Sequence, residues 1–429
     1  MAHATTTADL PARRVESVSA GLRAAVPALV ALGVLAFAAA LMTDGQRALR
    51  AYLFNWLFFT TVAQGAVMLA VIVIIAKGMW SRTSRRFALG FVAYLPVAYL
   101  LLLPIYIGAG DLFPWVEHVD PPGKAAYLNV PFMIARHVIL LGIVLALSLA
   151  FAYWSLRPDL GALKDQASGR VRALYDRMTQ GWRGQEAEEA LAHRRTQVIA
   201  PILAISYALG FSVVAWDFVM SLESHWYSTM IGPYLFMGGI LGGIAATAIT
   251  TIVLTGRLGL RDVIPENHFH DLGKMVFAFS VFWAYLYFSQ FIVIWYGNLE
   301  HEQTFIAHRY DMPFRPVAQL SFACMFVIPF FGLLGVKAKK TPKILATFAG
   351  IVLFGLWIER YFLIYPSFYQ GAPDMPFGWQ EIGIALLFAG LFLGSLLWFF
   401  TRFPVFQQWI PATEIELEGV DVEVPARAP

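Results

Sequence analysis

Ten separate runs of apolar residues, each long enough to cross a lipid bilayer as a helix, occupy most of this 429-residue chain. A span needs about 20 helical residues to cross roughly 30 Å of hydrocarbon. The runs lie at 22–42, 51–76, 87–108, 130–155, 197–221, 230–256, 274–297, 316–337, 342–364 and 379–401. Only 14% of the residues are charged, whereas about a quarter are charged in soluble proteins. The sequence therefore predicts an all-α polytopic membrane protein with ten transmembrane helices.

The order of the spans predicts two four-helix bundles. Spans two to five form the first bundle, at 51–229, and spans six to nine form the second, at 230–378. Four crossings return the chain to its starting side, so a parallel repeat about an axis normal to the membrane is expected. The first span with its loop, at 22–50, and the last span, at 379–401, flank the bundles. Close helix packing is expected at Gly238, Gly239, Gly242 and Gly243.

The distribution of basic residues predicts the orientation. Of the 31 lysines and arginines, 24 fall on the side of the N-terminus and five on the opposite side. Since cytoplasmic loops retain basic residues, we expect an inner-membrane protein with cytoplasmic tails at 1–21 and 402–429. The first span lacks a cleavage site and is expected to remain. The basic segment at 156–196 is either an ordinary cytoplasmic loop or a surface for anionic lipid or a partner.

Cysteine and histidine usage limits the cofactors that the chain can hold by itself. One cysteine, Cys324, excludes a disulfide framework and a self-contained iron-sulfur cluster. His137 is the one histidine clearly inside a predicted span, so a haem held by two histidines is not expected. We expect neither a bound metal nor a covalently bound cofactor. The net charge of +3 is sorted by membrane side, so nucleic-acid binding is set aside.

Ionisable residues inside the predicted spans are the candidate functional groups. A charge at the centre of a bilayer costs on the order of 2.5 to 3.5 kcal/mol, so such residues are retained for a reason. They gather at a similar depth near the side opposite the tails, and they are Arg136, His137, Asp217, Glu359, Arg360 and Glu381. The alternatives are structural salt bridges or acceptors for the two protons that a lipid-soluble quinol releases when it is oxidised.

Helix geometry limits which of these residues can pair. Adjacent helical residues point about 100° apart, so Glu359 and Arg360 are not expected to pair with each other. Arg136 is expected to pair with Asp217 on another helix, which would leave His137 free to accept a proton. The candidate catalytic residues are therefore His137, Asp217 and Arg136. Glu359, Arg360 and Glu381 are candidates for a proton path.

The seventh span is unusually aromatic, with ten aromatic residues at 277–296. Flat rings flank quinone headgroups well, which makes Tyr285, Tyr287 and Gln290 candidate quinone-binding residues, although aromatic packing between helices explains the same pattern. Asp271 and Lys274 precede this span. They are candidates for a proton entrance, or else they cap and charge the helix start.

The aromatic span and its flanks also carry a resemblance to a known family. Residues 270–303 read HDLGKMVFAFSVFWAYLYFSQFIVIWYGNLEHEQ. With ten spans, this stretch resembles the polysulfide-reductase membrane-subunit (NrfD-like) family, and within it the quinone-interacting membrane subunits of alternative complex III. The resemblance implies two four-helix bundles and a menaquinol-oxidising assembly. It also implies multihaem cytochrome and iron-sulfur partner subunits, which hold the haem and the clusters, and a second related membrane subunit.

Three functions remain open from the sequence. The first is a membrane subunit of a quinol:electron-acceptor oxidoreductase, delivering electrons to a cytochrome c or a copper protein, that supplies a quinol pocket or proton-conducting groups. The second is a stand-alone secondary transporter or proton channel, and the third is a passive assembly anchor.

Overall fold

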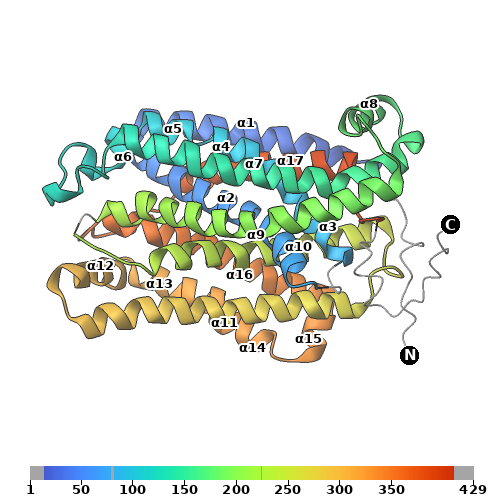
Figure 1. Cartoon of the computed structure of the whole chain (residues 1–429). Helices are drawn as coiled ribbons and strands as arrows, with labels where there is room; N and C mark the ends of the chain where they lie inside the picture. Colours follow the sequence, from blue (N-terminus) through green and yellow to red (C-terminus); the bar gives the residue numbers. More distant parts are fainter. Residues whose placement is uncertain (1–13, 79–81, 224, 410–429) are drawn as a thin grey trace.

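The computed structural model describes residues 14–78, 82–223 and 225–409. The outer parts of the two predicted tails, 1–13 and 410–429, lie outside the described residues. All regular secondary structure in the described part of the chain is helical, and ten helical segments there are long and apolar enough to cross a membrane. The prediction of an all-α polytopic membrane protein is confirmed. Figure 1 shows the long helices running side by side.

The spans contain both continuous and broken helices. They are α1 (Ala20–Thr43), α2 (Gly45–Ile75), the group α3 (Arg82–Leu89), α4 (Leu95–Leu100) and α5 (Leu103–Ile107), α7 (Val130–Leu163), α9 (Gln185–Phe218), α10 (Ile231–Leu258), α11 (Glu266–Gly297), the pair α13 (Arg315–Phe322) and α14 (Ile328–Gly332), α16 (Pro342–Ile364) and α17 (Trp379–Arg402). Shorter helices lie between the spans, namely α6 (Ala109–Leu112), α8 (Gly169–Met178), α12 (Glu300–Tyr310) and α15 (Val336–Lys340).

The helix contacts repeat in the two halves of the chain. α2 and α10, the first helices of each bundle, pack extensively on each other. α9 packs on α10 as α16 packs on α2, and α7 packs on α9 as the α13–α14 span packs on α16. The same pairing in both halves is what a parallel repeat produces. α1 and α17 pack on each other outside the bundles and contact the first bundle through α2, and α17 also packs on the third span at Gly90–Tyr94. We call the end that carries α8 and α15 the basic end, and the end that carries α6 and α12 the opposite end (Figure 1).

Glycines bring the two central helices into backbone contact. A methyl group at Gly65 of α2 would lie 2.0 Å from the carbonyl oxygen of Gly239 on α10, and one at Gly243 would lie 2.1 Å from the backbone nitrogen of Ala66. Helices in lipid gain stability from such close approach because van der Waals contact replaces the hydrophobic effect as the driving force. The expected close packing is confirmed.

Two spans are interrupted. The third span has a 3₁₀ turn at Gly90–Tyr94 and a further break before α5, with Pro96 and Pro104 in the first turns of α4 and α5. The eighth span contains a π-helical turn at Ala323–Val327 and ends at Gly332, five residues before the predicted end at 337. A proline removes an intrahelical hydrogen bond, which explains the breaks near Pro96, Pro104 and Pro329.

The segment predicted as a loop at 156–196 is mostly helical. α7 continues to Leu163, α8 follows, and α9 already begins at Gln185. Arg157, expected in this loop, is buried and forms a double hydrogen bond with Glu188, at 2.7 and 3.0 Å. Part of this polar segment is therefore buried at the basic end, because its charged residues Arg157 and Glu188 pair with each other.

The last described residues pack back onto the first bundle. The carboxylate of Asp159 on α7 accepts hydrogen bonds from the backbone nitrogens of Gln408, at 2.9 Å, and Trp409, at 3.3 Å. Asp159 also forms an ion pair with the buried Arg86. The indole nitrogen of Trp409 donates to the carbonyl of Ser155 at 3.1 Å. The C-terminal segment thus supplies two hydrogen-bond donors to the buried carboxylate of Asp159.

Candidate functional site

The first candidate is a charge cluster near the opposite end of the first bundle, formed by Arg136, His137, Asp217 and Tyr106. Arg136 on α7 donates to both carboxylate oxygens of Asp217 on α9, each at 2.7 Å, and to the carbonyl of Tyr127 at 2.8 Å. Asp217 is fully buried. Two parallel charge-assisted hydrogen bonds are the strongest arrangement for such a pair, and the predicted cross-helix pairing is confirmed.

His137 is not left free by this pairing, contrary to the expectation from the sequence. Its Nε2 lies 2.8 Å from Asp217 Oδ2, within ion-pair distance but without the alignment of a hydrogen bond. Its Nδ1 lies 3.1 Å from the hydroxyl of Tyr106, and Phe218 packs edge-on against the ring at 4.9 Å. The carboxylate of Asp217 has two oxygens and can contact both Arg136 and His137, whereas the sequence-based expectation assigned it to Arg136 alone. The cluster links α5, α7 and α9 as one unit.

The second candidate is the acid in the interior of the second bundle. Glu359 and Arg360, neighbours on α16, are both fully buried, and Arg360 Nη1 donates to Glu359 Oε2 at 2.6 Å. The expectation that these two residues cannot pair is wrong, because the arginine side chain is long enough to fold back over its own helix. Arg360 also donates to the carbonyl of Leu235 at 3.1 Å. Gly238 leaves room for it, since a methyl group there would lie 3.2 Å from Arg360 Nη2.

Glu359 keeps one oxygen without an aligned hydrogen bond. The unpartnered atom is Oε1, although the hydroxyl of Tyr234 lies close enough to interact with the carboxylate. Other buried polar atoms of this bundle also lack a hydrogen-bond partner, among them Ser280 Oγ, Trp283 Nε1 and Ser321 Oγ. Buried polar groups are normally satisfied. These polar atoms of the second bundle are therefore available to bind protons or water.

An aromatic cavity of about 600 Å³ lies between α11 and the α13–α14 span. Its lining is almost entirely apolar and aromatic, and consists of Val281, Ala284, Tyr285, Tyr287, Phe288, Phe291, Tyr310, Ala318, Gln319, Phe322 and Phe326. The side chains of Tyr285 and Phe288 are 61% and 57% exposed, so the cavity opens on the surface that faces lipid. Its volume lies in the range of small-molecule sites, about 300 to 1,000 Å³.

A row of tyrosines connects this cavity to Glu359. Tyr287 lines the cavity and forms a very short hydrogen bond with Tyr310 from α12. The rings of Tyr287 and Tyr234 have centroids 6.3 Å apart, and Tyr234 lies beside Glu359. The indole of Trp283 packs against Tyr287, with centroids 5.1 Å apart. The rings of Tyr287 and Tyr234 therefore lie between the cavity and Glu359, and phenol groups can both donate and accept hydrogen bonds.

The structure separates the three predicted quinone-binding residues. Tyr285 and Tyr287 both line the aromatic cavity. Gln290 lies one turn further along α11, lines two neighbouring pockets instead, and accepts a hydrogen bond from Ser228 at 2.6 Å. Tyr310, Phe322 and Phe326 were missed, because no pattern within one helix shows which face of another helix it meets.

The remaining predicted proton-path residues lie in other surroundings. Glu381 is fully buried and satisfied, since it pairs with Arg47 at 2.8 Å and accepts from Tyr365 at 2.6 Å and from the backbone nitrogen of Gly378 at 2.7 Å. Asp271 and Lys274 form an ion pair of 2.7 Å at the start of α11, which is the basic end. The length of α11 therefore separates this pair from the opposite end, where the other candidates gather.

An ion cluster at the opposite end was also missed. Glu223 accepts hydrogen bonds from Arg309 at 2.6 Å and from Ser367 at 2.9 Å, and His308 lies 3.2 Å away. Burial alone would raise the pKa of Glu223, but Arg309, His308 and Ser367 together hold that pKa below its ordinary value. These residues lie in predicted loops, so nothing in their hydropathy marked them. The cluster joins the end of α9 to α12 and to the end of α16.

Comparison with models of protein families gives no match, and comparison with curated proteins gives none either. The resemblance to the NrfD-like family therefore stays a prediction. Among the described residues, no group of three or more histidine, cysteine, aspartate or glutamate side chains could hold a metal ion.

Proposed function

We propose that this chain is the integral membrane subunit of a quinol:electron-acceptor oxidoreductase of the alternative complex III type, and that it binds quinol in the aromatic cavity. One observation carries the proposal. A cavity that opens to lipid is connected by tyrosines to a buried glutamate whose Oε1 lacks an aligned hydrogen bond. A lipid-soluble aromatic substrate enters from the bilayer, and its protons need an acceptor at that position.

The lining suits a quinol such as menaquinol. Phe288, Phe322 and Phe326 offer flat apolar walls for a bicyclic ring and its prenyl chain. The hydroxyls of Tyr287 and Tyr310 lie together at the cavity wall and can hydrogen-bond the substrate oxygens. Oxidation of one quinol releases two electrons and two protons. In this proposal the protons pass through Tyr287 and Tyr234 toward Glu359, and the electrons leave to a redox centre in a partner subunit.

The partners follow from this division of labour. The electrons require a redox partner, and the resemblance to the NrfD-like family implies multihaem cytochrome and iron-sulfur subunits with a final acceptor such as a cytochrome c or a copper protein. A second related membrane subunit would complete the assembly. The protein would sit in the inner membrane with both tails in the cytoplasm, as the basic residues predict.

The proposal gives the first-bundle charge cluster a supporting role. Arg136 is hydrogen-bonded to Asp217, His137 lies within ion-pair distance of the same carboxylate, and the aromatic cavity is lined by other residues. In this proposal Glu359 replaces His137 as the proton acceptor. The cluster then fixes α7 against α9, and the second bundle carries the chemistry.

The test has two parts. The native particle, solubilised in detergent, should contain haem-bearing partner chains and extractable quinone. In that particle, Glu359→Gln should slow quinol oxidation by about 10²- to 10⁴-fold, the usual contribution of a general base. Glu381→Gln, which alters an equally buried but fully satisfied acid, should leave the rate within a few-fold. Equal rates for both variants and the parent would contradict the proposal.

A proton-conducting module is the second candidate. The unpartnered polar atoms of Ser280, Trp283 and Ser321 favour it, because a chain of buried water could satisfy them. Proton uptake by vesicles holding the purified chain alone would support this function. Loss of assembly without any kinetic defect in the Glu359 variant would instead indicate a passive anchor.

A further inference from the structure

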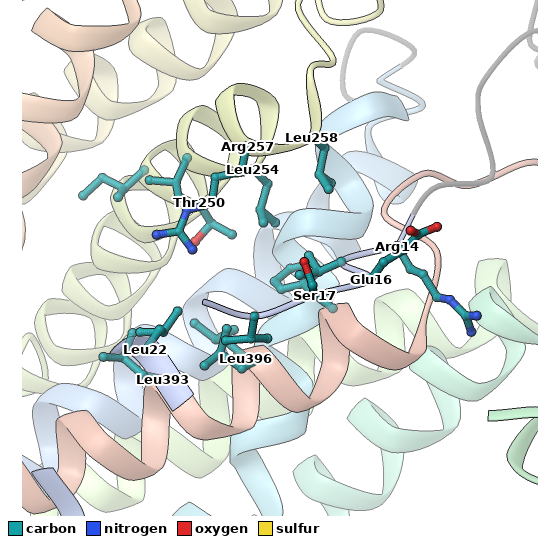
Figure 2. Close-up of a pocket in the computed structure, with 16 residues that line it drawn as sticks. Arg14, Glu16, Ser17, Leu22, Thr250, Leu254, Arg257, Leu258, Leu393 and Leu396 are labelled. Carbon is teal, nitrogen blue, oxygen red and sulfur yellow. The ribbon is translucent and has the colours of Figure 1, made fainter. Parts of the chain in front are cut away.

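A second large cavity, of about 650 Å³, lies at the basic end between α10, α17 and the segment at 14–19. Figure 2 shows this cavity, which we call the basic-end cavity. α10 packs on α2, α9, α11 and α16, whereas α17 packs on α1 and α2. The cavity therefore lies where the second bundle meets the outer pair of helices.

The lining of the basic-end cavity divides into a polar rim and an apolar floor. Arg257 and Thr250 lie on the α10 wall, and Ser17 lies on the facing wall (Figure 2). The floor is formed by Leu22, Leu393 and Leu396, which lie together in Figure 2, and the apolar side chains of Val253, Leu254 and Leu397 also line the cavity. The side chains of Val253 and Leu393 are 44% and 39% exposed, so the floor continues onto the lipid-facing surface.

The segment at 14–19, which forms the wall facing α10, is held in place by hydrogen bonds. The backbone nitrogen of Val15 donates to the carbonyl of Phe400 at 2.9 Å, and Arg23 donates to the carbonyl of Val18 at 2.8 Å. The helix α1 begins directly after this wall, and the N-terminus of a helix favours an anion. Glu16 and Arg14 also line the cavity, but in Figure 2 their side chains point away from Arg257 and Thr250. Arg14 lies beside Tyr175.

We propose that the basic-end cavity binds a glycerophospholipid, with its phosphodiester at Arg257 and Ser17 and its acyl chains over Leu22, Leu393 and Val253. The charge pattern and the position support this occupant together. A soluble anion could pair with Arg257 but would not occupy the apolar floor, and a lipid without phosphate could occupy the floor but would not pair with Arg257. Basic residues at this depth attract phospholipid headgroups.

The residues that precede the segment at 14–19 suit the cavity less well. Residues 1–13, which precede the facing wall, contain a single acid, Asp9, and no apolar run. They could supply neither an extended counter-charge nor a chain for the floor. A bound phospholipid would join α10 to α1 and α17. It would thereby connect the second bundle to the outer helices at a place that helix contacts leave open.

Native mass spectrometry of the purified full-length chain, stripped of lipid and then given phosphatidylglycerol, tests the proposal. Arg257→Gln is expected to weaken binding about fivefold, the effect of one basic residue near a membrane surface. The matched control is Arg261→Gln, which removes an exposed arginine outside the cavity and should leave binding unchanged. Val253→Trp, at an exposed position, should reduce binding by obstructing the floor without a change of charge.

Three results would overturn the proposal. Equal binding of a galactolipid with the same acyl chains would show that the phosphate is not recognised. Displacement by inorganic phosphate alone would show a soluble-anion site. A photo-activated cross-linker at Val253 that labels residues 1–13 or 410–429 in place of lipid would show that the chain itself fills the cavity. Because none of these readouts involves quinol, their outcome is independent of the proposed catalytic function.

Discussion

Asp217 on α9 binds Arg136 on α7 through two parallel hydrogen bonds of 2.7 Å, entirely inside the protein. The guanidinium also stacks on the ring of Tyr127 at 3.9 Å. A buried ion pair contributes little over a well-packed apolar pair, but either charge left alone is costly. We therefore expect this cluster to tolerate removal of both charges together better than removal of one of them.

Asp217→Asn is expected to destabilise the protein by about 3 to 5 kcal/mol, because it leaves the Arg136 cation buried without a compensating charge. Thermal unfolding in detergent would measure the loss. The double variant Arg136→Met, Asp217→Leu should recover much of it, since both charges are removed together. A double variant less stable than Asp217→Asn would show that the pair is needed for more than mutual compensation.

Gly243→Ala is expected to destabilise the contact between α2 and α10 by about 1 to 3 kcal/mol or more, because the new methyl group would overlap the backbone at Ala66. The matched control is Gly256→Ala on the same helix, where nothing lies within 4 Å of the added methyl. Alanine is the better helix former by about 0.8 to 1.0 kcal/mol. Gly256→Ala should therefore unfold at the same temperature as the parent or a higher one.

The Glu223 cluster predicts a loss of stability in acid. The folded state holds the pKa of Glu223 below its ordinary value near 4.5, so this carboxylate contributes stability above that pH. The contribution should fall as the pH drops from about 4.5 through the lower folded-state pKa. Unfolding temperatures between pH 7 and pH 3 would measure it.

Glu223→Gln should flatten this pH dependence. It should also lower stability at pH 7, because the buried Arg309 loses its charged partner. Glu300→Gln, at an exposed position near the same end, is the control and should retain the parent profile. An unchanged acid profile in Glu223→Gln would assign the acid sensitivity to another carboxylate.

Val281→Trp tests the aromatic cavity, because Val281 lines it and is 37% exposed. The larger side chain should fill the entrance and raise the KM for quinol about tenfold, or about 1.4 kcal/mol, with a smaller change in kcat. Val138→Trp introduces the same side chain at an exposed position of α7 and should leave both constants unchanged. A similar KM in the two variants would exclude the cavity as the entrance.

The spans were predictable because a helix in lipid must be apolar and must satisfy its own backbone, which leaves a plain signal in the sequence. The pairing of Arg136 with Asp217 was also predictable, since a charge at that depth requires a partner. The contact between Glu359 and Arg360 was not, because the 100° rule treats side chains as fixed directions. A long arginine side chain can bend back along its helix.

The location of the aromatic cavity could be predicted only in part. The aromatic residues at 277–296 lie on α11, and Tyr285 and Tyr287, two of the three candidate quinone-binding residues chosen there, line the cavity. The opposite wall depends on how the α13–α14 span bends at its π-helical turn, which no periodicity in the sequence reports. Hydropathy also ended the fourth span at 155, so the pairs of Arg157 and Asp159 were assigned to a loop.

The two hydrogen bonds from the backbone of residues 408 and 409 to Asp159 can form only late in the synthesis of the chain. Asp159 is made with the fourth span, yet two of its hydrogen-bond donors leave the ribosome only after the tenth. Until then the carboxylate of Asp159, which pairs with Arg86, must accept these hydrogen bonds from water instead. The first bundle therefore reaches its final set of hydrogen bonds only when the whole membrane domain has been made, and a chain that stops before Gln408 would leave the carboxylate of Asp159 without these two donors.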